Sequence, residues 1–127
     1  MRDIANNIGA VQAVAPAVLT ATNTSAAIDL LGYNSAAVII NTGAIVASGN
    51  FTPKLQESDV SGSGYTDVAA ADLVGEFPAA LAAASVYKVG YIGSRRYVRT
   101  VLTLNSGTSI AAGAVIVKGN AADKPVA

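Results

Sequence analysis

Short runs of β-branched and other apolar residues alternate with turn residues along most of the chain. The runs are PAVLTAT at 16–22, AAIDLLG at 26–32 and AAVIIN at 36–41, and they are followed by NTS, YNS and TGAIVASGN. A spacing of about 8–12 residues between such runs is typical of an all-β sandwich or barrel. The sequence therefore predicts an all-β fold, a single β-sandwich of jelly-roll type.

The segment FTPKLQES at 51–58 has the clearest alternation. Phe51, Pro53 and Leu55 alternate with polar residues, which predicts a strand with one buried face. Pro53 has no N–H group, so we expect it on an edge strand or beside a bulge. DVSGSG at 59–64 predicts a turn, because its glycines can adopt positive φ angles, and YTDVA at 65–69 would return as the partner strand.

The second half of the chain predicts one helical turn and three strands. Alanines in DVAAADLVGEFPAALAAAS favour a helix, but Gly75 and Pro78 interrupt it, so we expect a short helical turn near 68–73 and then a loop. Strands are predicted for SVYKVGYIG, RYVRTVLTLN and AGAVIVKG, which are rich in Val, Ile, Tyr and Thr. Residues 120–127 are expected to form a loose C-terminal tail.

The N-terminal segment MRDIANNIGAVQAVA carries scattered apolar residues without a clear period. This pattern is typical of an arm that becomes ordered only against a partner, with Arg2, Ile4 and Ile8 as its expected contacts. The alternative is a first strand of the sandwich. We expect an arm over residues 1–9 and a strand that begins between Val11 and Val18. Polar residues break the apolar region that a signal peptide needs, so none is expected.

Composition indicates one small domain that associates with other proteins. The chain has 127 residues, of which 52% are hydrophobic but only 6% aromatic, so the core should be built from small side chains. Eight basic and eight acidic residues give a formal net charge of zero. The long-range field that attracts nucleic acid or an anionic membrane is therefore absent, and a nearly neutral apolar domain tends to associate.

The sequence offers little chemistry. It contains no cysteine and no histidine, which excludes disulfides, thiol nucleophiles and histidine-based triads. There is no phosphate-binding loop, and no apolar run approaches the roughly 20 residues that span a bilayer. Four carboxylates, Glu57, Asp59, Asp67 and Asp72, could serve a metal or acid–base site, but they flank a turn, where such residues commonly have a structural role. The sequence indicates a non-enzymatic protein without cofactors.

Three arginines stand in YIGSRRYVRTVLTL at 91–104. In a strand, Arg95, Tyr97 and Arg99 share the outer face, where Arg99 and Tyr97 can stack. One interpretation is a cross-strand ion pair with Glu57 or Asp59. The other is an interface, since Tyr and Arg are enriched at binding hot spots. Both stay open at this point.

Arg96 falls on the opposite face of the same predicted strand, together with apolar residues that must face the core. A charge is too costly to bury without a partner. We therefore expect Arg96 to turn out to solvent or to pair with a carboxylate such as Asp67 or Asp72, and to have a structural role.

A family resemblance narrows the function. The pattern K-x-x-E-S-D followed by Y-T-D-V, with a later Y-x-G-x-x-R-Y-V-R, covers roughly residues 51–103 and resembles small proteins encoded among the head genes of tailed bacteriophages, prophages and gene transfer agents. The resemblance implies a capsid decoration, or cement, protein on the outer surface of the phage head. It implies the major capsid protein as partner, a homotrimer, and a virion protein made in the host cytoplasm.

Two other functions fit the same sequence. A carbohydrate-binding β-sandwich could use the five tyrosines, although the absence of tryptophan counts against a platform for stacking sugars. A tail or baseplate component could contain the same hairpins. No nucleic acid or membrane partner is expected.

Overall fold

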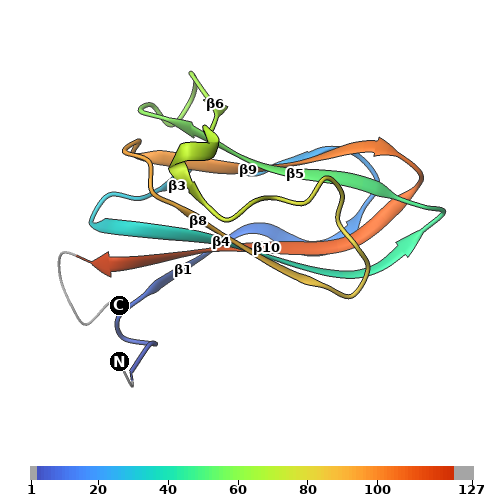
Figure 1. The fold of residues 1–127 in the computed structure, drawn as a ribbon, viewed down its shortest axis with the longest axis horizontal. Coiled ribbons are helices and arrows are strands. Elements are labelled where there is room, and N and C mark those ends of the chain that lie inside the picture. Colours follow the sequence, from blue (N-terminus) through green and yellow to red (C-terminus); the bar gives the residue numbers. More distant parts are fainter. Residues whose placement is uncertain (1–2, 122–127) are drawn as a thin grey trace.

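The computed structural model describes residues 3–121, and they form two antiparallel sheets packed face to face (Figure 1). The first sheet has the order β1-β10-β4-β8-β7, and the second has the order β2-β9-β5-β6, with β3 also paired to β9. The strands are β1 Gly9–Leu19, β2 Asn23–Thr24, β3 Ile28–Asp29, β4 Tyr33–Val46, β5 Asn50–Ser58, β6 Thr66–Asp67, β7 Leu73–Val74, β8 Val86–Tyr91, β9 Tyr97–Ser106 and β10 Ser109–Ala121.

The strand order confirms the jelly-roll prediction. Because β2 and β3 both pair with β9, they act as one interrupted strand. With the short β7 set aside, each sheet then has four strands, and the first strand pairs with the last. Chain neighbours lie mostly in opposite sheets, which is the double Greek-key arrangement of a jelly roll.

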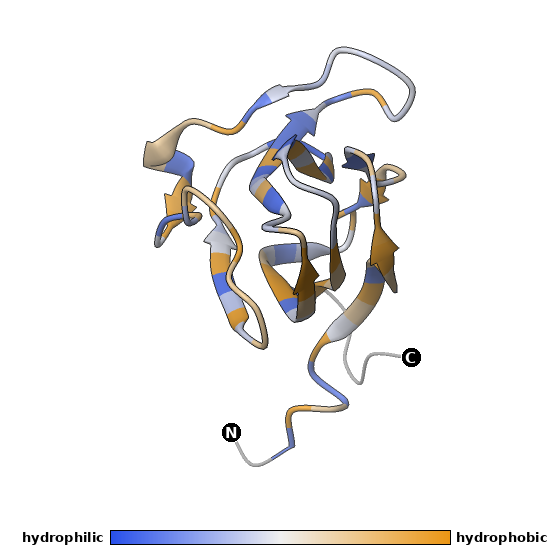
Figure 2. Ribbon diagram, turned by 90° about the vertical axis from the view of Figure 1, so that its right-hand side faces the viewer, coloured by the Kyte–Doolittle hydropathy of each residue, from blue (hydrophilic) through white to orange (hydrophobic). Residues whose placement is uncertain are grey.

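The core lies between the sheets and is built from the inward positions of the alternating strands. Phe51, Leu102, Ile110 and Ile116 have no exposed surface at all. Among the buried hydrophobic residues of the described chain, Phe51 and Tyr91 are the only aromatic ones, and the others are Val, Leu, Ile and Ala. The low aromatic content of the sequence predicted such a core. Figure 2 shows hydrophobic residues, in orange, along the strands of the sandwich, with hydrophilic residues interspersed.

The hairpin between β4 and β5 is tighter than the sequence indicates. Ala47 and Ser48 both have positive φ, at 50° and 56°, and the N–H of Gly49 donates to the carbonyl of Val46 at 3.2 Å. Gly49 packs against the backbone of Ser109, where a Cβ atom would collide with the carbonyl oxygen. The turn therefore requires glycine at this position because of close backbone approach.

Most predicted elements are present, with different lengths. The helical turn is a 3-10 helix at Ala70–Asp72, and the partner strand of β5 shrinks to Thr66–Asp67. β1 begins at Gly9, before the expected range, and β4 continues through residues 42–46, where we expected a turn. Pro53 pairs with Leu102 of β9 on one side of β5. On the other side, β6 pairs only with Gln56 and Glu57, so β5 is an edge strand at Pro53, as expected.

The described part of the N-terminal segment lies outside the sheets. Residues 3–8 form turns that lead away from the sandwich (Figure 1). Asp3 accepts hydrogen bonds from Asn6, and Ile4 is 57% exposed, whereas Ile8 is half-buried. Arg2 and residues 122–127 of the expected tail lie outside the described residues, and residues 120 and 121 belong to β10.

Candidate functional site

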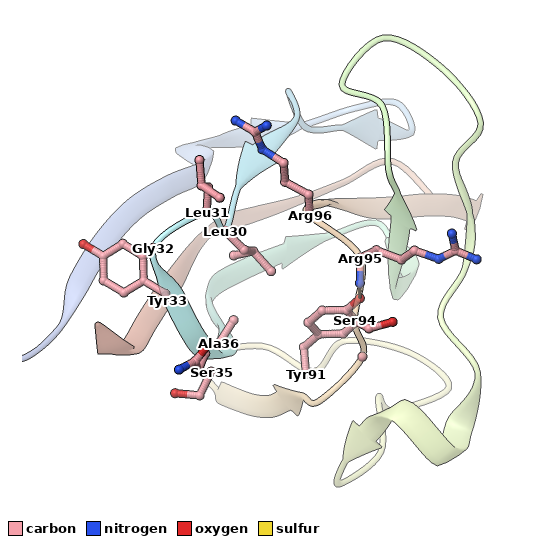
Figure 3. Close-up of a pocket in the computed structure, with 12 residues that line it drawn as sticks. Leu30, Leu31, Gly32, Tyr33, Ser35, Ala36, Tyr91, Ser94, Arg95 and Arg96 are labelled. Carbon is pink, nitrogen blue, oxygen red and sulfur yellow. Dashed lines mark hydrogen bonds between the residues drawn. The ribbon is translucent and has the colours of Figure 1, made fainter. Parts of the chain in front are cut away.

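The arginine-bearing end of the sandwich is made by three connections. The β8–β9 connection carries Arg95 and Arg96, and it lies beside the β3–β4 connection around a pocket of about 400 Å³. The β5–β6 turn lies next to the same connection, at a smaller hollow that Arg95 also lines. In Figure 3 the guanidinium groups of Arg95 and Arg96 point away from one another and out of the pocket, while Tyr91 points inward.

Arg96 is held by Asp29, not by Asp67 or Asp72 as expected. Its Nε and one terminal nitrogen donate to the two carboxylate oxygens of Asp29 at 2.9 and 2.8 Å. The hydrogen bonds from Arg96 lower the pKa of Asp29 from 3.8 to about 2, helped by the backbone N–H of Leu31. The expected pairing with a carboxylate is present, but the named candidates were wrong because β3 pairs with the start of β9, which brings Asp29 opposite Tyr97.

Arg95 forms an ion pair with Asp59, one of the two carboxylates expected for it. Both arginines precede β9, which begins at Tyr97, so neither follows the alternation of the predicted strand. The N–H of Arg95 donates to the hydroxyl of Tyr91 at 3.1 Å, and that hydroxyl donates to Glu57 at 2.7 Å. Burial raises the pKa of Tyr91 well above its ordinary value, and the carboxylate of Glu57 adds to the effect. These contacts fix the connection in place.

Arg99 lies on the outer face of β9, as predicted, but its contacts differ from the expected ones. Its Nε donates to Oε1 of Gln56 at 2.8 Å, and its guanidinium carbon lies 4.1 Å from the ring centre of Tyr65. The ring of Tyr97 instead lies 5.0 Å from the guanidinium carbon of Arg96. The neighbouring Val98, Thr100 and Leu102 are buried, as the alternation predicted, so the expected core face is confirmed for these residues of β9 but not for Arg96.

A hydrogen-bonded chain of polar side chains continues from Arg99 across the outer face of this sheet. Gln56 donates from Nε2 to Asp67 at 2.9 Å, and Lys54 lies 3.3 Å from the same carboxylate. The hydrogen bond from Gln56 and the ammonium of Lys54 hold the pKa of Asp67 below its usual value. We call Lys54, Gln56, Tyr65, Asp67, Tyr97 and Arg99 the polar sheet face.

The sequence could have indicated part of this arrangement. It singled out Arg99 and Tyr97, but it missed Gln56 and Tyr65. Gln56 is directly opposite Arg99 in the β5–β9 register, which alternation alone does not give. Tyr65 lies just after a turn, and its hydroxyl donates to the carbonyl of Ser61 at 2.9 Å, which holds its ring under the guanidinium.

The carboxylates expected near the β5–β6 turn go to separate partners. Glu57 binds Tyr91, Asp59 binds Arg95, and Asp67 binds Gln56 and Lys54. Within residues 3–121, no group of three or more carboxylates, histidines or cysteines could hold a metal ion. The same part of the chain contains no helix long and apolar enough to cross a membrane.

Comparisons with known proteins add little information about function. No protein-family model matches the chain, and no curated protein matches it. Among solved structures, the chain is similar to one described as the structure of infectious bursal disease virus Gx strain, at 13% sequence identity and a TM-score of 0.44. The match covers 93% of this chain and 33% of that one, so the chain spans about a third of its length.

Proposed function

We propose that this protein is a non-enzymatic virion structural protein that binds the outer surface of a tailed-phage head and stabilises the shell. The resemblance at residues 51–103 suggests this role, and the jelly-roll fold suits it because viral capsid domains commonly use that fold. The partner would be the major capsid protein. The protein would be made in the host cytoplasm and act on the head surface.

The observation that carries the proposal is the preorganised polar sheet face. Arg99 is half-buried, stacked on Tyr65 and oriented by Gln56, so little side-chain freedom remains to be lost on binding. A planar guanidinium has five donors, and the one hydrogen bond to Gln56 uses only the Nε donor, which leaves the terminal N–H groups for carbonyls or carboxylates of a partner. Arg and Tyr anchors of this kind dominate the energetics of many protein interfaces.

Arg95 and Arg96 have a different role in this proposal. Each is paired with a carboxylate of its own chain, so a partner carboxylate would have to compete with Asp59 or Asp29. We therefore place the capsid contact on Arg99, Tyr97 and Tyr65, and we assign Arg95 and Arg96 to holding the β8–β9 connection.

A binding experiment with purified particles tests the proposal. Emptied heads and isolated tails are incubated separately with the purified protein and pelleted, and the bound protein is measured. We expect saturable binding to heads and none to tails. Binding to tails alone would instead support a tail or baseplate component, and binding to neither would contradict a virion role.

The pocket of about 400 Å³ is the feature that favours a carbohydrate-binding module. Asn34, Ser35 and Ser94 line it and could hydrogen-bond to sugar hydroxyls. Its two tyrosines are less suitable for stacking, because Tyr91 is only 3% exposed and the ammonium of Lys118 lies 4.5 Å from the ring centre of Tyr33. A glycan array would decide this alternative, because only a carbohydrate-binding module would give selective binding.

A further inference from the structure

The outer face of the first sheet is apolar where water would ordinarily favour polar residues. Ile116 and Val38 are buried in the core, yet their neighbours Val115, Val117 and Ile39, which point the opposite way, are apolar as well. Antiparallel strands with one wet face usually alternate apolar and polar residues, whereas strands covered on both faces are continuously apolar. The residues of β4 and β10 therefore predict a second covering layer.

The register of the sheet arranges this face in rows across the strands. One row is Gln12, Val115, Ile39 and Lys88, and the next is Ala10, Val117, Ala37 and Gly90. Lys88 carries the single charge among the described outward-facing residues of β1, β10, β4 and β8. We call these two rows, together with Val86, the apolar sheet face.

The first of these rows is complementary to the same row of a second copy that runs in the opposite direction. It has two apolar residues at its centre, an amide at one end and an ammonium group at the other. A two-fold axis parallel to the strands, between β10 and β4, would place Val115 over Ile39 of a second copy and Lys88 over its Gln12. Lys88 could then donate to the amide oxygen. An axis across the strands would bring the two lysines together, which is unfavourable.

The shape of the face fits the same rotation. A hollow of about 630 Å³ lies over β1, β10 and β4, and small residues such as Gly43, Ala111 and Gly113 line it beside Pro16. Val86 is 67% exposed and lies in register with Asn41 at the opposite margin of the face. The axis parallel to the strands carries Val86 of one copy to the hollow of the other.

We propose that two copies of this chain pair face to face through the apolar sheet face, about a two-fold axis parallel to β4 and β10. Sheets packed in this way lie about 10 Å apart, and their interdigitating side chains exclude water. Such an isologous contact closes after two copies, so it differs from the trimer that the resemblance implies. The pairing does not depend on the capsid proposal, because it requires no particle.

Sedimentation equilibrium of the full chain, without particles, tests the pairing. The wild type should be a dimer at micromolar concentrations. Val115→Asp should raise the dissociation constant at least about a hundredfold, because it places a carboxylate in a dry contact. The control is Val60→Asp, since Val60 is 58% exposed on the β5–β6 turn and should leave the dimer unchanged. A monomeric wild type, or a trimer that Val115→Asp does not affect, would overturn the proposal.

A charge exchange tests the axis without disturbing the apolar centre. Gln12→Lys should weaken the dimer about tenfold or more, because it faces Lys88 of the other copy. Adding Lys88→Glu to that variant should restore the dimer or strengthen it, since opposite charges then meet. Circular dichroism would check that each variant is folded. Failure of the double variant to recover would contradict the proposed axis.

Discussion

Arg96 and Asp29 form a two-bond pair that joins the start of β9 to β3, across 67 residues of sequence. The pair has a definite pH dependence. Because the folded-state pKa of Asp29, at about 2, lies below its value of 3.8 in an unperturbed chain, the pair stabilises the fold above about pH 4. That stability is lost as the pH falls from about 4 towards 2.

Asp29→Asn should therefore remove part of the acid sensitivity. Urea unfolding at about pH 7 and about pH 2.5 should show a smaller loss of stability for this variant than for the wild type. The effect should be small, since both side chains are more than 40% exposed and solvent screens the pair. Equal pH dependence in the two proteins would mean that the pair does not form in solution.

Leu102→Ala should destabilise the sandwich strongly. Leu102 has no exposed surface and packs in the core between the two sheets, so its truncation should leave a cavity. We expect a loss of about 2–5 kcal/mol in the free energy of unfolding. Val74→Ala, at a site that is 58% exposed, is the control and should change stability by less than about 0.5 kcal/mol. Similar losses in both variants would contradict the assignment of the core.

Gly49→Ala should lower stability through a backbone collision. A Cβ atom at this position would meet the carbonyl of Ser109, so the β4–β5 turn or the start of β10 must move. We expect a cost of about 1–3 kcal/mol. Gly62→Ala is the matched control, because a Cβ atom there has nothing within 4 Å and its φ is not positive. Equal melting temperatures for the two variants would contradict the close contact between Gly49 and the backbone of Ser109.

The fold could be predicted because its main signal is local. Alternation in FTPKLQES and continuous apolar runs in β4 and β10 indicate strands without any knowledge of their partners. The end of β4 was missed because the turn at Ala47 and Ser48 lacks the Asn-Gly signal typical of such tight hairpins. The β7 strand was missed because two residues are too few for a periodic pattern.

The partners of the arginines could not be predicted, because they depend on strand pairing. Arg96 pairs with Asp29 because β3 adds to the edge of β9, and Arg99 meets Gln56 through the β5–β9 register. The residue types of the polar sheet face were visible in the sequence, but their neighbours were not. The continuous apolar runs of β4 and β10 indicate strands, and they also predict that a further layer covers the outer face of the sheet.

The most direct test of the proposed function is the affinity of Arg99→Ala for emptied phage heads, measured together with its melting temperature. If Arg99 is an interface anchor, binding should weaken by about 1–3 kcal/mol while the melting temperature stays nearly unchanged. Arg96→Ala is the matched control, and it should bind heads normally because Arg96 already has Asp29 as its partner. A lower melting temperature of Arg99→Ala with normal binding to heads would contradict the account, because Arg99 would then only hold the sheet together.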